Sequence, residues 1–168
     1  MSMKNIGGAG STSELSAIQE GDVQPNAVDL RIGKVFRISK NTFEVDNENK
    51  VHRGSDPCEL NRHGIFNLPE GHYEVIMENK IKVGAGEAGF VITRSTLNRN
   101  GVFLTSGLYD SGYRGVMAGT MHVGCGVCRV KKGTRVGQFL CFDAEAIGRY
   151  DGSYGAESDH DVRYAGEI

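Results

Sequence analysis

Short stretches in which apolar and polar residues alternate recur along most of this chain. Residues 28–32 and 35–38 alternate in this way, and strand-like segments follow at residues 64–68, 73–77, 80–83, 90–94, 102–104, 116–123, 127–130 and 135–142. A period of two is typical of half-buried strands, because successive side chains point to opposite faces. No stretch with helical periodicity is longer than about 12 residues. The pattern therefore predicts a domain made almost entirely of short β-strands.

Glycine-containing turn signals separate these segments. They fall at residues 69–71, 84–89, 100–101 and 131–133. The 168 residues include 24 glycines but only three prolines, and the glycines are dispersed rather than gathered in a linker. Glycine adopts positive φ without steric cost, so this distribution suits many tight turns and an all-β architecture. Residues 39–64 are polar and predict a strand pair and an exposed loop.

The two ends of the chain differ from the middle. Residues 1–12 are small and polar, and Ser11 and Glu14 have the spacing of a capping box, which predicts one short helix over residues 12–19. Residues 148–168 are polar but contain three tyrosines, as an ordered arm would. We therefore expect a tail with a short helix at 1–20, a β domain at 21–147 and a C-terminal arm at 148–168.

Composition and charge narrow the classes of protein. Nineteen Lys and Arg against 21 Asp and Glu give a formal charge of −2, so binding of nucleic acid by bulk electrostatics is not expected. No apolar run approaches the ~20 residues that span a bilayer, and the polar start lacks a signal sequence. We expect a soluble, cytoplasmic protein without membrane or nucleic-acid partners. The four cysteines are expected to be reduced thiols.

The densest group of chemically useful residues lies at residues 94–101 and 107–115. Arg94 and Arg99, with the hydroxyls of Ser95 and Thr96, form a set of donors suited to a polyphosphate. Asp110 follows sixteen residues after Arg94, across a predicted hairpin, where a carboxylate base can activate water. The same residues also fit a solvated turn whose arginines pair with surface acids.

Four motifs in this order resemble those of the dCTP deaminase and dUTPase superfamily. They are residues 25–33 (PNAVDLRIG), 94–97 (RSTL), 107–115 (GLYDSGYRG) and 133–139 (GTRVGQF). The resemblance implies an all-β distorted jelly roll (β-clip) that assembles as a homotrimer with active sites shared between subunits. It also implies Mg²⁺ as cofactor and a deoxypyrimidine nucleoside triphosphate as ligand.

The same resemblance implies a role for individual residues. Asp110 matches the base that orients the attacking water, and Arg99 an arginine near the phosphates and that water. Asp29 either holds a metal-bound water or fixes a turn. The expected substrate contacts are Arg94, Ser95, Thr96 and Gln138 for the phosphates, Tyr113 under the deoxyribose, Ser106 and Leu108 for the pyrimidine edge, and Arg149 and Tyr154 in an arm that closes over the triphosphate.

Thr120 separates the two reactions of the superfamily. It stands where the deaminases carry a proton-transferring glutamate, and a hydroxyl cannot replace that carboxylate. No other acid lies between Asp110 and Asp143. Hydrolysis of dUTP to dUMP and pyrophosphate is therefore favoured. The alternatives are a dCTP deaminase or a bifunctional dCTP deaminase/dUTPase, since Gly112 and the tail at 149–155 (RYDGSYG) resemble the deaminase branch, and a non-catalytic nucleotide-binding regulatory trimer.

One further group invites a metal-site interpretation. His122, Cys125 and Cys128 are three soft ligands spaced by three residues. A closed zinc site needs four ligands, and no second pair is evident. Buried or subunit-contact thiols are the simpler expectation.

Overall fold

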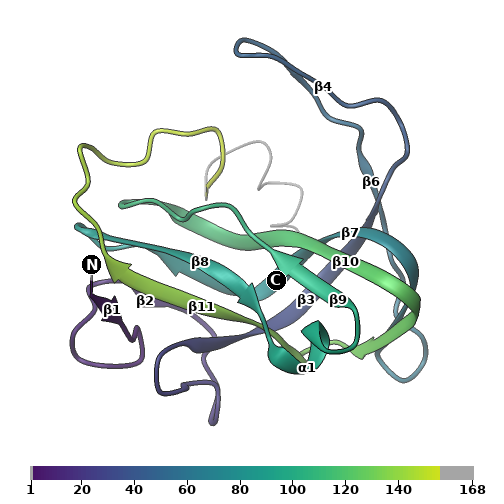
Figure 1. The fold of residues 1–168 in the computed structure, drawn as a ribbon, viewed down its shortest axis with the longest axis horizontal. Coiled ribbons are helices and arrows are strands. Elements are labelled where there is room, and N and C mark those ends of the chain that lie inside the picture. Colours follow the sequence, from purple (N-terminus) through teal and green to yellow (C-terminus); the bar gives the residue numbers. More distant parts are fainter. Residues whose placement is uncertain (1, 156–168) are drawn as a thin grey trace.

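The computed structural model describes residues 2–155, which form two packed layers of antiparallel strands (Figure 1). The elements are β1 (Met3–Lys4), β2 (Glu14–Leu15), β3 (Val28–Ile38), β4 (Glu44–Val45), β5 (Lys50–Val51), β6 (Ser55–Pro57), β7 (Ile65–Lys82), β8 (Glu87–Thr93), α1 (Ser95–Asn98), β9 (Val102–Thr105), β10 (Arg114–Lys131) and β11 (Arg135–Asp143). The main path through the sheet is β1-β11-β3-β7-β10-β9, with β8 on β11, β6 on β3 and β2 on β7. The predicted all-β jelly-roll class is confirmed.

Strand β3 belongs to both layers. Its first half pairs with β11 and its second half with β7, and the pairing with β7 shifts register between Ile32 and Lys34. Gly33 lies at this shift, where a Cβ atom would come within 3.1 Å of the Ile76 carbonyl oxygen. Glycine is therefore needed where β3 passes closely over β7.

The core lies between the two layers. Side chains from β3, β7, β10 and β11 fill it, and the largest fully buried ones include Leu30, Ile32, Tyr73, Met117, Met121 and Phe139. They come from alternate positions of their strands, as the period-two pattern requires.

One predicted turn, and one break between two predicted strands, are bulges inside longer strands. Residues 65–82 form one strand, although residues 69–71 carry a turn signal, and β10 likewise runs on through residues 124–126. The two irregularities face each other: the pairing jumps from Val123 with Gly71 to Val127 with Pro69. Proline and glycine are tolerated there because the ladder is already interrupted.

The helix expected over residues 12–19 is wrong. The Ser11 hydroxyl and the Thr12 and Ser13 amides donate instead to the carboxylate of Glu87, and Glu14 pairs with Lys82 at 2.9 Å. Residues 14–15 are accordingly extended as β2. The distant carboxylate offers the amides acceptors that compete with a local helical turn. Among the described residues the only α-helix is α1.

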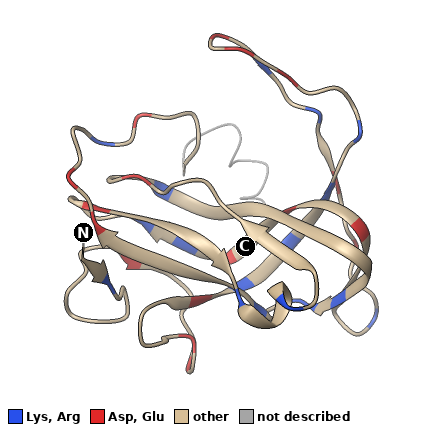
Figure 2. Cartoon of the chain, viewed as in Figure 1, with Lys and Arg blue, Asp and Glu red and all other residues tan. Residues whose placement is uncertain are grey.

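Residues 39–54 form an arm that projects from the sheet and carries the β4–β5 hairpin (Figure 1). Lys, Arg, Asp and Glu are interspersed along the arm and along the strands (Figure 2). Within residues 2–155 no helix has the length and apolar character needed to cross a membrane.

The Glu87 carboxylate makes the stability of the folded protein depend on pH. Burial by itself raises its pKa, but hydrogen bonds from Ser13, Thr12 and Ser11 outweigh burial and hold the pKa at about 2. Because this value lies below the ordinary 4.5, the stabilisation is fully present above about pH 4.5 and is lost as the pH falls towards about 2.

We predict that Glu87→Gln lowers the free energy of unfolding at pH 7 by about 3 kcal/mol, the equivalent of this pKa difference. Urea unfolding at pH 7 and pH 3 measures this free energy, and the difference between the variant and the wild type should be smaller at pH 3. Glu14→Gln, which removes an exposed ion pair, is the matched control and should leave the unfolding midpoint unchanged. An equal midpoint for Glu87→Gln and the wild type at pH 7 would contradict the assigned role.

Candidate active site

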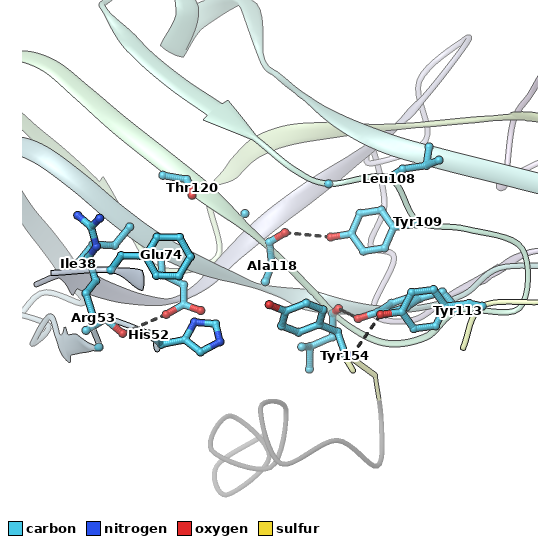
Figure 3. Close-up of a pocket in the computed structure, with 17 residues that line it drawn as sticks. Ile38, His52, Arg53, Glu74, Leu108, Tyr109, Tyr113, Ala118, Thr120 and Tyr154 are labelled. Carbon is cyan, nitrogen blue, oxygen red and sulfur yellow. Dashed lines mark hydrogen bonds between the residues drawn. The ribbon is translucent and has the colours of Figure 1, made fainter. Parts of the chain in front are cut away.

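A cavity of about 530 Å³ opens on the outer side of β10 (Figure 3). Its walls come from β6, β7, β10, the 107–109 loop, the projecting arm and the C-terminal segment. Of the residues expected at the site, Leu108, Tyr113 and Tyr154 line it. The volume falls in the range of small-molecule sites.

Three tyrosines form one wall of the cavity. Tyr113 packs edge-on against Tyr109 and Tyr150, with ring centroids 5.3 and 5.2 Å away. The Tyr113 hydroxyl donates to the Val116 carbonyl at 2.8 Å, and the Tyr109 hydroxyl to the Ala118 carbonyl at 3.0 Å. Their polar ends are thus fixed on β10, and the rings present a rigid apolar surface suited to a sugar.

Asp110 lies beside this wall at the tip of a tight turn. Tyr109 exchanges two backbone hydrogen bonds with Gly89, and the Tyr113 amide donates to the Asp110 carbonyl at 3.0 Å. Gly112 closes the turn at a φ of +86°. The backbone around Asp110 is therefore fixed on both sides while its side chain is exposed. The positive φ also accounts for a glycine at position 112.

Asp29 lies fully buried on β3 among hydrogen-bond donors. Gln138 donates to one oxygen at 3.1 Å, and Arg94 and Arg135 each approach the other at 3.4 Å. Two guanidinium groups and an amide would repel a cation and suit an anion, so this donor set does not fit a metal. Asp29 lies within strand β3 rather than in the turn it was expected to fix, and it holds two of the expected phosphate contacts, Arg94 and Gln138, side by side.

The remaining phosphate-type donors lie on or beside α1. Arg94 is the residue before this helix, and its amide donates to the Val136 carbonyl of β11. Ser95 and Thr96 are exposed in the first turn, and Arg99 is exposed at the end. The structure thus brings Arg94, Ser95, Thr96 and Gln138 to one end of β8.

Asp110 lies at the other end of the same strand. Its neighbour Tyr109 pairs with Gly89, near the start of β8, whereas Arg94 follows the last residue of β8. The five residue-to-residue steps from Gly89 to Arg94 cover about 16 Å at the usual strand rise. One chain therefore does not bring the expected base and the expected phosphate donors together.

Ser106 and Leu108 have different environments. The Ser106 hydroxyl accepts from the Val91 amide and donates to the Gly107 carbonyl, each at 2.8 Å, so it ties the loop to β8 and does not line the cavity. Leu108 lines the cavity and is more than half exposed. Of the two, only Leu108 is placed to contact a ligand in this cavity.

The C-terminal segment packs against the Asp110 turn as far as it is described. The Tyr150 amide donates to the Ser111 carbonyl at 2.9 Å, and a Cβ at Gly112 would lie 3.3 Å from the Cβ of Arg149. Tyr154 reaches the cavity, with the Lys50 ammonium 5.8 Å from its ring centroid. The rest of the expected arm, residues 156–168, lies outside the described residues.

The cavity also holds polar residues that the sequence analysis did not identify. Glu74 on β7, and His52 and Arg53 on the projecting arm, line the end farthest from Tyr113 (Figure 3). Ser55 on β6, which donates a hydrogen bond to Glu74, lines the cavity as well. In the sequence, Glu74 is a polar residue within an otherwise apolar strand segment, and this was the feature that could have indicated a functional side chain. Its place in the cavity depends on strand register.

His122 does not join the cysteines in a metal centre. Its Nδ1 lies 2.7 Å from Nδ1 of His72 on the paired strand. No group of three His, Cys, Asp or Glu side chains placed to hold a metal occurs in the described part of the chain. Cys125 is exposed and Cys128 half-buried, and neither is in a disulfide.

Residues 8–144 match the family model described as dCTP deaminase-like. The chain belongs to this family. It is 32% identical over 134 residues to a probable deoxyuridine 5′-triphosphate nucleotidohydrolase of Methanothermobacter thermautotrophicus, which covers 79% of this chain and 87% of that protein. A relative of the same name from Methanopyrus kandleri is 32% identical over 143 residues, 82% of this chain and 90% of that protein.

Solved structures show the same fold. A 2′-deoxycytidine 5′-triphosphate deaminase from Agrobacterium tumefaciens superposes with a TM-score of 0.63 at 18% identity, over 86% of this chain and 48% of the deaminase, so the match spans about half of that enzyme. A dUTPase from phage phi11 of S. aureus has a TM-score of 0.52 at 10% identity, over 87% of this chain and 99% of that protein.

We predict that Gly112→Ala destabilises the protein by about 1–2 kcal/mol, because it forces a Cβ into the left-handed region and against Arg149. Thermal unfolding measures the loss. Gly107→Ala is the matched control, since a Cβ there meets nothing within 4 Å. If both variants unfold at the same temperature as the wild type, the turn does not require glycine at position 112.

Proposed function

We propose that this protein is a dUTP diphosphatase, which hydrolyses dUTP to dUMP and pyrophosphate. The observation that carries the proposal is Asp110, an exposed carboxylate on a rigid turn beside a cavity with a tyrosine wall. Relatives covering about four-fifths of the chain carry the name of this activity.

In the proposed reaction Asp110 acts as general base. Its carboxylate accepts a proton from a water molecule, and the water oxygen forms a bond to the α-phosphorus. The bond from that phosphorus to the bridging oxygen breaks, and pyrophosphate leaves with the electron pair. A fixed base of this kind accelerates such a step by about 10²–10⁴-fold.

The arginines and hydroxyls at the end of β8 bind the triphosphate. Arg94 and Gln138 hold their positions through Asp29, while Ser95, Thr96 and Arg99 are exposed beside them. In the proposal they stabilise the charge that develops on the phosphate oxygens, with Arg99 next to the reacting water. Arg149 and Tyr154 would cover the triphosphate from the C-terminal side.

The proposed site is shared between copies of the chain. Asp110 and the phosphate donors around Arg94 lie at opposite ends of β8, about 16 Å apart along the strand. A base and the phosphates it acts beside cannot be separated in this way in one site. We therefore infer a homotrimer in which Asp110 and Tyr113 of one copy face Arg94 and Gln138 of the next.

Mg²⁺ fits this site as an ion carried by the nucleotide. Mg²⁺ is commonly bound through substrate phosphates with one or two carboxylates rather than in a protein cage. The described residues offer no such cage, and Asp29 is surrounded by donors. The ion would neutralise phosphate charge, and Asp110 is the carboxylate of the site that could hold one of its waters.

Replacing the base tests the mechanism. We predict that Asp110→Asn lowers kcat for dUTP about 1,000-fold, since the amide cannot accept the proton, while the affinity for a non-hydrolysable dUTP analogue is retained. Pyrophosphate release and calorimetry measure the two effects. Asp56→Asn, an exposed residue that does not line the cavity, is the control. Unchanged turnover in Asp110→Asn would remove Asp110 from the mechanism.

The shared site predicts complementation between two inactive variants. When Asp110→Asn and Arg94→Ala chains are co-expressed in equal amounts, random assembly gives about a quarter of the sites both intact residues from neighbouring copies, and about a quarter of wild-type activity returns. The same variants purified separately and assayed together without subunit exchange are the control. A co-expressed mixture as inactive as either variant would show that one copy supplies both residues.

A further inference from the structure

The far end of the cavity pairs an acid with a hydroxyl on neighbouring strands. Glu74 on β7 and Thr120 on β10 are direct partners in the antiparallel ladder. Directly opposed residues share a face, with Cβ atoms about 5 Å apart. Both line the cavity together with Ser55 and His52, and Figure 3 shows Glu74 and His52 at the end away from Tyr113. A carboxylate from β7 thus lies beside the Thr120 hydroxyl in the cavity.

The Glu74 carboxylate is held in place rather than free to rotate. The Ser55 hydroxyl of β6 donates to its Oε2 at 3.0 Å, and the backbone of Glu74 lies between β3, where it faces Phe36, and β10. The bond from Ser55 orients this carboxylate, and a carboxylate can accept about four hydrogen bonds in all.

The way the cavity runs along β10 places the pyrimidine base of a bound nucleotide at this end. Tyr113, the expected platform for the sugar, directly precedes β10 and packs against Tyr109, and the cavity then follows the strand past Val116 and Ala118 to Thr120. A nucleoside with its sugar on the tyrosine wall therefore points its base towards the Glu74–Thr120 pair.

We propose that Glu74 and Thr120 read the edge of uracil, an inference that rests on the proposed hydrolysis of dUTP. Uracil presents a donor, the N3–H group, beside an acceptor, the O4 oxygen. The Glu74 carboxylate accepts from N3–H and the Thr120 hydroxyl donates to O4. Glu74 is then a specificity-determining residue, distinct from the base Asp110.

The same pair disfavours cytosine. Cytosine carries an acceptor at N3, and an ionised carboxylate has no proton to give it, so two lone pairs would face each other. Its 4-amino group is a donor where uracil has the O4 acceptor, so the Thr120 hydroxyl could not donate a hydrogen bond to it. Discrimination of this kind, in which the wrong ligand leaves buried polar groups unpaired, is stronger than discrimination by size.

The test compares dUTP with dCTP. For the wild type, Glu74→Gln and Thr120→Val, kcat/KM is measured for release of pyrophosphate from each nucleotide. We expect Glu74→Gln to lower the preference for dUTP at least about 30-fold, because the amide can turn its NH₂ group towards cytosine N3. Thr120→Val should lower kcat/KM for dUTP about 10-fold without improving dCTP.

Glu78→Gln is the matched control, because it makes the same change on the same strand outside the cavity. Its dUTP/dCTP ratio should equal that of the wild type. An equal ratio in Glu74→Gln as well would overturn the proposal. Release of ammonia from dCTP by the wild type, lost in Glu74→Gln, would also overturn it, because Glu74 would then transfer protons rather than select the base.

Binding separates this proposal from the proposed reaction. Calorimetry with dUMP and dCMP should show a preference for dUMP in the wild type that Glu74→Gln loses. If the wild type has this preference but releases no pyrophosphate from dUTP, the hydrolase proposal fails and the role of Glu74 in base selection is supported. If pyrophosphate is released but Glu74→Gln keeps the preference for dUMP, the role of Glu74 is refuted and the hydrolase proposal stands.

Discussion

The antiparallel ladder between β7 and β10 determines which side chains can meet over the cavity. Because side chains alternate between faces, moving this register by one residue would turn Thr120 and Glu74 into the core and expose their apolar neighbours. Burial of Met117, Met121, Val75 and Tyr73 on the inner face therefore also fixes what the outer face presents. The pairing is continuous from Ala118 with Ile76 to Val123 with Gly71, so the register shifts lie on either side of the Thr120–Glu74 pair.

A second constraint is the charge balance at Asp29. One buried carboxylate is surrounded by Arg94, Arg135 and Gln138, so the local charge is positive before any ligand arrives. Asp29 keeps Arg94 close to β11, and a guanidinium already in position loses less conformational entropy when it binds phosphate. In the proposed site, the buried Asp29 carboxylate would thus influence how well Arg94 and Gln138 bind an anion.

Much of the fold and part of the site could be predicted from the sequence. The alternation at residues 28–38 and 135–142 indicated true strands, and the motif at residues 107–115 contains Leu108, Tyr109 and Tyr113, which line the cavity. The helix at residues 12–19 was wrong because Glu87, more than 70 residues away, accepts the hydrogen bonds that a local cap would need. Sequence spacing also hid Glu74, since its neighbour Thr120 is 46 residues distant and only the ladder register joins them. Likewise, the spacing of sixteen positions from Arg94 to Asp110 did not indicate how far apart the two residues lie along β8.

That separation has a consequence for how activity depends on the amount of protein. If catalysis needs Asp110 of one copy and Arg94 of another, a lone chain holds only half of each reaction centre. Specific activity would then fall on dilution, and a nucleotide lying across two copies would itself hold the assembly together. Freshly made chains would remain inert towards the cellular nucleotide supply until they found partners.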